Sequence, residues 1–188
     1  MKIFFDTLFF IVIGYHSYKF ILILIKMNHD VIVPVKSEEL TFIRRHPQKT
    51  VALPIYSEQK LGIVTYGAML VLVIVLFIVG VFINHLDWQF YLLMFLPLTY
   101  SHDLFNMFAF SKEGVLSGSR FVPWKSVKSF QIIPIDLNHK LYGYSKEVNN
   151  GYELIIKTKG FSVRGIVTSD EIKEKFTEIL TEHLFTKK

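Results

Sequence analysis

The sequence predicts an α+β membrane protein, in which transmembrane helices precede an antiparallel β-sheet or half-barrel that a C-terminal helix caps. Three observations lead to this fold class. Residues 61–83 carry no charge, short β-branched segments divided by glycine turns begin near Met107, and apolar residues recur at helical spacing from Ile172 onward. Hydrophobic residues make up 51% of the chain and aromatic residues 15%. Because lipid or a packed partner must cover so much apolar surface, an ordinary soluble domain is not expected.

The clearest membrane segment is residues 61–83, since 23 uncharged residues are enough to cross the hydrocarbon core of a bilayer. A short polar turn, residues 84–87, leads into a second apolar run over 88–108. So short a turn returns the second run alongside the first. We therefore expect residues 61–108 to form an antiparallel transmembrane hairpin.

Residues 1–25 have the length of a further span, but Asp6, His16 and Lys19 interrupt their apolar sequence. They contain no good small-residue cleavage site of a secretory signal peptide. Two interpretations remain open. The segment is a third transmembrane helix with polar interior positions, or it is a helix that lies in the membrane interface beside the hairpin.

The distribution of Lys and Arg predicts the orientation. Residues 26–60 contain six of them, residues 61–108 none and residues 109–188 thirteen. Basic residues concentrate on the cytoplasmic side of membrane proteins, so we expect a multi-pass protein of the cell membrane with a cytoplasmic connector and C-terminus. Topology and attraction to anionic lipids account for the net charge of +5, and nucleic acid is not expected as a partner.

The connector, residues 26–60, is expected to contain an extended segment over 31–35 and a short helix over 37–46. Ser37 can cap this helix, and Arg44 and Arg45 suit its negative end. Its apolar face can lie on the bilayer or on the C-terminal region.

Residues 109–188 are expected to form a cytoplasmic domain of short antiparallel strands. Glycine turns at Gly114 and Gly160 predict hairpins, and residues 136–150 form a polar loop. A capping box over 168–171 then predicts the start of a C-terminal helix. Its apolar stripe is expected to cover an open end of the sheet; the stripe consists of Ile172, Phe176, Ile179 and Leu180.

One arrangement of these strands carries a family resemblance. A Glu113-Gly114 turn is followed, before the third strand, by an apolar segment with Pro123, Trp124 and Val127. With the capped C-terminal helix, residues 107–185 resemble the bacterial pleckstrin-homology-like domains, above all the membrane-anchored kind with a transmembrane hairpin before the domain. The resemblance implies a binding or scaffolding module without a catalytic centre.

Polar residues inside the predicted spans are the first candidate site. His16 and Lys19 lie three positions apart and so share one side of a helix. This side can pack against the hairpin or another protomer, with Asp6 of another protomer or Asp103 as counter-charge; it can also be an interfacial accident or part of a relay. His102 and Asp103 lie at the inner end of the hairpin, where they are functional or simply a hydrated helix terminus.

The second candidate site is a basic surface that touches inner-leaflet lipids, for which Arg44, Arg45, Lys125 and Lys128 are the candidates. Arg120 belongs to a wider basic group that forms either a headgroup-binding face or a solvated surface. His85 and Asp87 are too few to hold a metal. The chain lacks cysteine and has no phosphate-binding loop or hydrolase motif, so we predict no cofactor and no enzymatic activity.

Two functions follow from these expectations. The first is a non-enzymatic integral membrane protein that presents a pleckstrin-homology-like interaction module at the inner leaflet, for example in an envelope-stress or peptide-immunity system. Its partners are membrane lipids and a membrane protein or a second copy of the chain. The alternative is a small oligomeric transporter or channel subunit whose intramembrane polar residues form the pathway.

Overall fold

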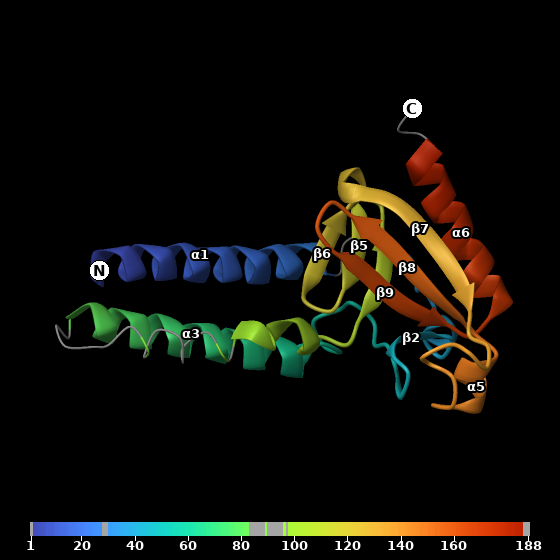
Figure 1. Ribbon diagram of the computed structural model, residues 1–188, viewed down its shortest axis with the longest axis horizontal. Helices are drawn as coiled ribbons and strands as arrows, with labels where there is room; N and C mark the ends of the chain where they lie inside the picture. The colour runs from blue at the N-terminus through green and yellow to red at the C-terminus, as the bar shows by residue number, and fades with distance from the viewer. Residues whose placement is uncertain (1, 28–29, 83–88, 90–95, 97, 186–188) are drawn as a thin grey trace.

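The computed structural model describes residues 2–27, 30–82, 89, 96 and 98–185. Two long helices, α1 (Lys2–Lys26) and α3 (Lys60–Phe82), lie side by side in opposite directions, and two β-sheets gather at one end of the pair (Figure 1). Both helices are long and apolar enough to cross a membrane. They therefore suggest that the chain associates with one.

The predicted turn over 84–87 lies outside the described residues, as do residues 88, 90–95 and 97 of the return segment predicted over 88–108. Its inner end differs from the prediction. Ser101–Asp103 form a short 3-10 helix, η1, and Phe108 is the first residue of a strand. The apolar run continues into Phe108 because this side chain packs inside the domain, where it is fully buried.

All strand pairings in the two sheets are antiparallel. The first sheet has the order β1-β4-β5-β6, with β1 (Val31–Val33), β4 (Phe108–Ser111), β5 (Gly114–Ser117) and β6 (Arg120–Pro123). The second has the order β3-β2-β9-β8-β7, with β2 (Ile43–His46), β3 (Lys49–Thr50), β7 (Val127–Pro134), β8 (Tyr152–Thr158) and β9 (Ser162–Val167). A second 3-10 helix, η2 (Trp124–Ser126), joins them. The predicted hairpins at Gly114 and Gly160 are confirmed.

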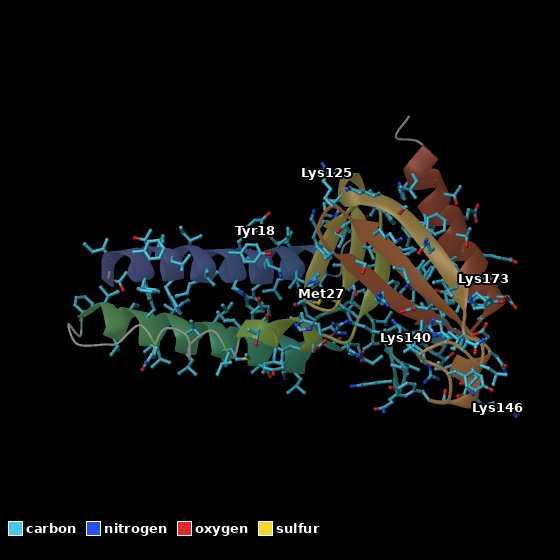
Figure 2. The ribbon with its side chains drawn as sticks, viewed as in Figure 1. Tyr18, Met27, Lys125, Lys140, Lys146 and Lys173 are labelled. Atoms are coloured by element: carbon cyan, nitrogen blue, oxygen red, sulfur yellow. The ribbon has the colours of Figure 1, made fainter. Side chains whose placement is uncertain are left out.

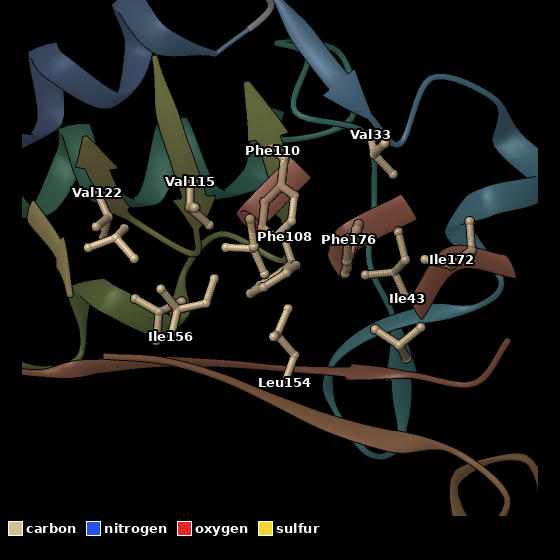
Figure 3. Close-up of a cluster of buried hydrophobic side chains, with 14 of the residues drawn as sticks. Val33, Ile43, Phe108, Phe110, Val115, Val122, Leu154, Ile156, Ile172 and Phe176 are labelled. Atoms are coloured by element: carbon tan, nitrogen blue, oxygen red, sulfur yellow. The ribbon is translucent and has the colours of Figure 1, made fainter. Parts of the chain in front are cut away.

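The main core lies between the two sheets and helix α6 (Asp170–Phe185) (Figure 3). The Phe176 ring reaches in from α6 and stands 4.4 Å from the Phe110 ring, centroid to centroid. Ile172, Phe176 and Leu180 are buried, which confirms the predicted apolar stripe. Gly165 leaves room for Phe108, whose ring would lie 2.9 Å from a Cβ at that position.

The connector differs from the prediction. The helix expected over 37–46 is wrong beyond its first turn, because α2 spans only Ser37–Leu40 and Ile43–His46 forms strand β2. Ile43 is fully buried in the core, and β2 pairs with β9. Burial of Ile43 and this pairing outweigh the helical pattern. Strands β1 and β2 thus add one strand each to the two sheets that the C-terminal region builds.

The start of α6 and the polar loop also differ in detail. Thr168 donates its backbone N–H to the Phe42 carbonyl at 2.9 Å, which extends the β2–β9 pairing, and α6 begins only at Asp170. The predicted polar loop contains a short helix, α5 (Lys146–Asn149), and packs on the outer face of the second sheet. Val148 is fully buried there, against Ile166.

Candidate functional site

Side-chain and strand contacts hold the end of α1 against the domain. Lys26, the last residue of α1, forms an ion pair with Glu113 in the β4–β5 turn. Met27 is fully buried, and β1 begins a few residues later and pairs with β4. Several contacts along one short segment therefore hold α1 against the first sheet.

Three adjoining cavities lie at this junction, and Arg120 lines all of them; we call them together the Arg120 cleft. The first, of about 350 Å³, is lined by Tyr15, Tyr18, Lys19, Leu22, Ser119, Arg120, Phe121 and Phe161. The second, of about 340 Å³, is lined by Arg45, His46, His102, Asp103, Ser117, Arg120, Ser162, Val163 and Arg164. The third, of about 260 Å³, is lined by Tyr15, His16, Lys19, Leu98, Thr99, Ser101, His102 and Arg120.

A tight turn carries Arg120 to this place. Strands β5 and β6 are joined through Gly118, whose φ of +55° is unfavourable for a residue with a side chain. A Cβ at Gly118 would lie 2.5 Å from the His102 carbonyl oxygen, so only glycine lets the turn approach η1 this closely. The next two residues, Ser119 and Arg120, then face α1. The Arg120 guanidinium lies 5.2 Å from the centre of the Phe161 ring, within range of a cation–π contact.

The charges that line the cleft are unbalanced. Arg45 Nη2 lies 2.7 Å from Asp103 Oδ1, and Arg164 Nη1 lies 3.0 Å from Glu153 Oε1, so these two cations have carboxylate partners. Within the described part of the chain, neither Lys19 nor Arg120 forms an ion pair. Asp103 lines the second cavity together with Arg120 but is engaged by Arg45. The two positive charges of Lys19 and Arg120 thus have no carboxylate partner among the described residues.

Burial is the main influence on the ionisation of the neighbouring groups. Burial lowers the pKa of the Arg45 guanidinium, the Asp103 carboxylate opposes that shift, and the charge of Arg120 adds to it. Arg45 nevertheless stays cationic, since arginine is not deprotonated in proteins. The pKa of His46 lies below its ordinary value because of burial and then because of the Arg45 charge. His46 is therefore neutral at physiological pH and adds no further charge.

The structure brings three of the predicted polar residues to one cavity: His16, Lys19 and His102 all line the third cavity of the cleft. His16 Nδ1 lies 3.3 Å from the hydroxyl oxygen of Tyr66 on α3, so this histidine contacts the neighbouring helix. Asp103 is engaged by Arg45 and by His102, whose Nε2 lies 3.1 Å from Oδ2. It forms no ion pair with Lys19 or His16, the two residues for which it was considered as counter-charge.

The four predicted lipid contacts do not form one surface. Arg45 points into the domain, where Nη1 donates to the Phe105 carbonyl at 3.1 Å, and Arg44 Nη1 donates to the Pro47 carbonyl at 3.1 Å. Lys125 and Lys128 are exposed and line none of the three cavities. Figure 2 shows Lys125 on the side of the domain nearer the helices, with Lys146 and Lys173 at the far end.

The sequence did not single out Ser119, and it indicated Arg120 only as one member of a wider basic group. Ser119 is only 2% exposed, and its hydroxyl oxygen has no hydrogen-bond partner among the described residues. The only available signal was a Ser-Gly-Ser-Arg run at a hairpin turn. Nothing local in that run indicates that the turn packs against a helix about 100 residues earlier in the chain.

The cleft is suited to holding an anion, because its unpaired groups are two cations and a hydroxyl donor. Throughout the described ranges, no group of three or more His, Asp or Glu side chains is arranged to hold a metal ion. Comparison of the chain with family models, with curated proteins and with solved structures found no match. What the site does must therefore be inferred from its own geometry.

Proposed function

We propose that this chain is a non-enzymatic integral membrane protein that presents a pleckstrin-homology-like interaction module at the inner leaflet of the cell membrane. The observation that carries the proposal is the way the apolar helices enter the sheets. Strand β1 begins at Val31, soon after the end of α1 at Lys26, β2 and β3 lie between α1 and α3 in the sequence, and all three strands pair within the domain. A domain built in this way stays at the membrane surface and keeps one orientation.

The arrangement of strands supports the pleckstrin-homology-like part of the proposal. Two antiparallel sheets enclose one core, and a single C-terminal helix packs against it. Trp124 follows the Glu113-Gly114 turn as the resemblance implies. It is only 9% exposed, donates from Nε1 to the Ser111 carbonyl at 3.0 Å and stacks on His183. This tryptophan is a core residue, which fits a binding module whose ligands lie elsewhere.

The positions of the helix ends support three spans with a cytoplasmic domain. Phe82 ends α3 on the side away from the sheets, whereas Leu98 lines the cleft beside them (Figure 1). Phe82 and Leu98 thus lie toward opposite ends of α3, as the predicted third span between them requires. Lys26 and Lys60 mark the domain side of the two helices, as the positive-inside rule requires for a cytoplasmic domain.

Labelling of single cysteines tests this topology, and the natural chain has no cysteine that interferes. Asn84→Cys is placed in the predicted outer turn, and Leu137→Cys at an exposed position of the domain. With a membrane-impermeant maleimide, we expect Asn84→Cys to react in intact cells and Leu137→Cys only after permeabilisation. The reverse pattern, or release of the chain by alkaline carbonate, would overturn the proposal.

One observation favours the alternative of an oligomeric transporter or channel subunit. His16, Lys19, Ser101 and His102 line a cavity between α1 and the inner end of the predicted hairpin. A pathway across the bilayer requires several copies of so small a chain. Chemical cross-linking in mild detergent therefore separates the two functions, because a defined oligomer favours the pathway and a monomer favours the interaction module.

A further inference from the structure

The first cavity of the Arg120 cleft contains two cationic side chains without a carboxylate partner. Lys19 comes from α1 and Arg120 from β6, and both line the same space. Neither has a carboxylate partner within the residues that the structure describes. Two like charges in a partly apolar cavity repel each other and lose hydration, so they favour the binding of an anion between them.

Ser119 is an independent sign of a ligand at this place. Its side chain is almost completely buried, it lines the same cavity, and its hydroxyl has no partner among the described residues. Buried hydroxyl groups in proteins normally form hydrogen bonds. An oxygen atom of an anion placed between Lys19 and Arg120 would accept this missing hydrogen bond.

The remaining wall of the cavity identifies the kind of anion. Leu22, Phe121 and Phe161 are apolar, and Tyr15 and Tyr18 continue the wall along α1. These tyrosines are 57% and 62% exposed, and Tyr18 projects from α1 on the side opposite α3 (Figure 2). Lys19 lies seven residues before the end of α1, about 10 Å from it, on the part of the helix that enters the membrane. A small soluble anion would not contact this apolar surface, whereas an anion that carries an apolar group would cover it.

We propose that this cavity binds the phosphate of an anionic membrane phospholipid. Lys19 and Arg120 hold the phosphate oxygens, Ser119 donates a hydrogen bond to one of them, and the acyl chains lie along Tyr15 and Tyr18 on the exposed face of α1. The inference rests on the proposed membrane insertion of α1. The sequence predicted only a general attraction between basic residues and the inner leaflet, whereas this proposal names one defined binding site.

The test uses the full-length protein reconstituted in phosphatidylcholine vesicles that contain phosphatidylglycerol, then extracted in mild detergent and examined by native mass spectrometry. We expect one phosphatidylglycerol to remain bound to the natural protein. Lys19→Gln and Arg120→Gln should each reduce this occupancy about tenfold or more, since each removes a charge-assisted hydrogen bond. Lys125→Gln is the matched control, because it removes an exposed charge outside the cleft, and it should leave occupancy unchanged.

Three results would overturn the inference. Occupancy could be the same in all variants, or Lys125→Gln could lower it as much as Arg120→Gln does, which would indicate non-specific attraction. Millimolar glycerol phosphate could displace the lipid from the natural protein, which would indicate a soluble phosphate ligand. Because Lys19 and Arg120 lie on different elements, either variant carries the test if the other fails to fold, as judged by a thermal melt.

The failure of this inference is distinguishable from the failure of the proposed function. If the chain resists extraction by alkaline carbonate but retains no phosphatidylglycerol, only the lipid site is wrong. If carbonate releases the chain, it is not an integral membrane protein, and both conclusions fail.

Discussion

Arg45 and Asp103 join strand β2 to η1 across 58 residues of sequence, through a 2.7 Å contact between Nη2 and Oδ1. The Arg45 side chain is only 12% exposed, whereas Asp103 is 45% exposed. The same guanidinium donates to the Phe105 carbonyl. This single side chain therefore links the connector to the segment that leads into β4.

Removal of the Asp103 charge should destabilise the fold. Asp103→Asn leaves the largely buried Arg45 guanidinium without its carboxylate, and we expect a loss of about 1–2 kcal/mol in the free energy of unfolding, less than for a fully buried pair because Asp103 faces solvent. Asp30→Asn is the control, since its ion pair with Lys112 is exposed on both sides. Thermal melts in detergent measure both; equal effects would show that the Arg45 pair has no special role.

The buried carboxylate of Glu153 should make stability depend on acid pH. Burial alone would raise its pKa, but hydrogen bonds from Lys140 and Arg164 outweigh that effect and hold the pKa below its ordinary value. The resulting stabilisation is present above the unfolded-state pKa of about 4.3 and is lost as pH falls through the lower folded-state pKa.

Glu153→Gln should accordingly be less stable than the natural protein at pH 7, by about 1–2 kcal/mol. The difference in melting temperature between the two proteins should begin to narrow below about pH 5. At position 153 only the natural protein carries a carboxylate, and acid neutralises it. Glu174→Gln, on the exposed face of α6, is the control, and its melting temperature should change with pH as that of the natural protein does. A difference that stays constant or widens with acidification would contradict the prediction.

Gly62 should tolerate substitution much less well than Gly67 on the same helix. A Cβ at Gly62 would lie 2.6 Å from the Leu104 carbonyl oxygen, whereas a Cβ at Gly67 would meet only the Phe20 ring at 3.7 Å. Backbone cannot move aside as a side chain can, so Gly62→Ala should destabilise the protein by about 1–3 kcal/mol. Gly67→Ala should change stability by less than about 1 kcal/mol. Similar melting temperatures for the two variants would contradict the close packing of α3 on residues 104–105.

Ile43 should be essential to the domain although it precedes α3 in the sequence. It is fully buried in the main core, so Ile43→Ala should cost about 2–5 kcal/mol. Its neighbour Phe42 is 41% exposed, and Phe42→Ala should cost less than about 1 kcal/mol. The two substitutions remove apolar side chains at adjacent positions, and denaturant unfolding compares them directly.

A truncated chain tests the same point more severely. A fragment of residues 107–188 lacks β1 and β2 and should show no cooperative melt. The same fragment joined through a flexible linker to residues 30–51 should regain one, because Val33 and Ile43 then return to the core. A cooperative melt of the shorter fragment alone would show that the connector strands are dispensable.

Local patterns in the sequence were enough for several elements. The apolar lengths of α1 and α3 are visible without a structure, because spanning the hydrocarbon core requires a long, predominantly apolar run. The β8–β9 hairpin follows from the turn at Gly160, and the stripe on α6 follows from its helical spacing. In each case the forces that select the element act between residues close together in the chain.

Only the tertiary structure decided the identity of β2 and the location of the candidate site. Residues 43–46 are compatible with the end of a helix, and they become a strand because Ile43 fills the core and its neighbours pair with β9. Lys19 and Arg120 are separated by about 100 residues, and although Lys19 stands out as a charge in an apolar segment, nothing local indicates that it lies near Arg120. Gly118 lets the β5–β6 turn pack closely against η1. Ser119 and Arg120, which follow it, then line a cavity together with Lys19 of α1, and this arrangement depends on contacts between elements far apart in the sequence.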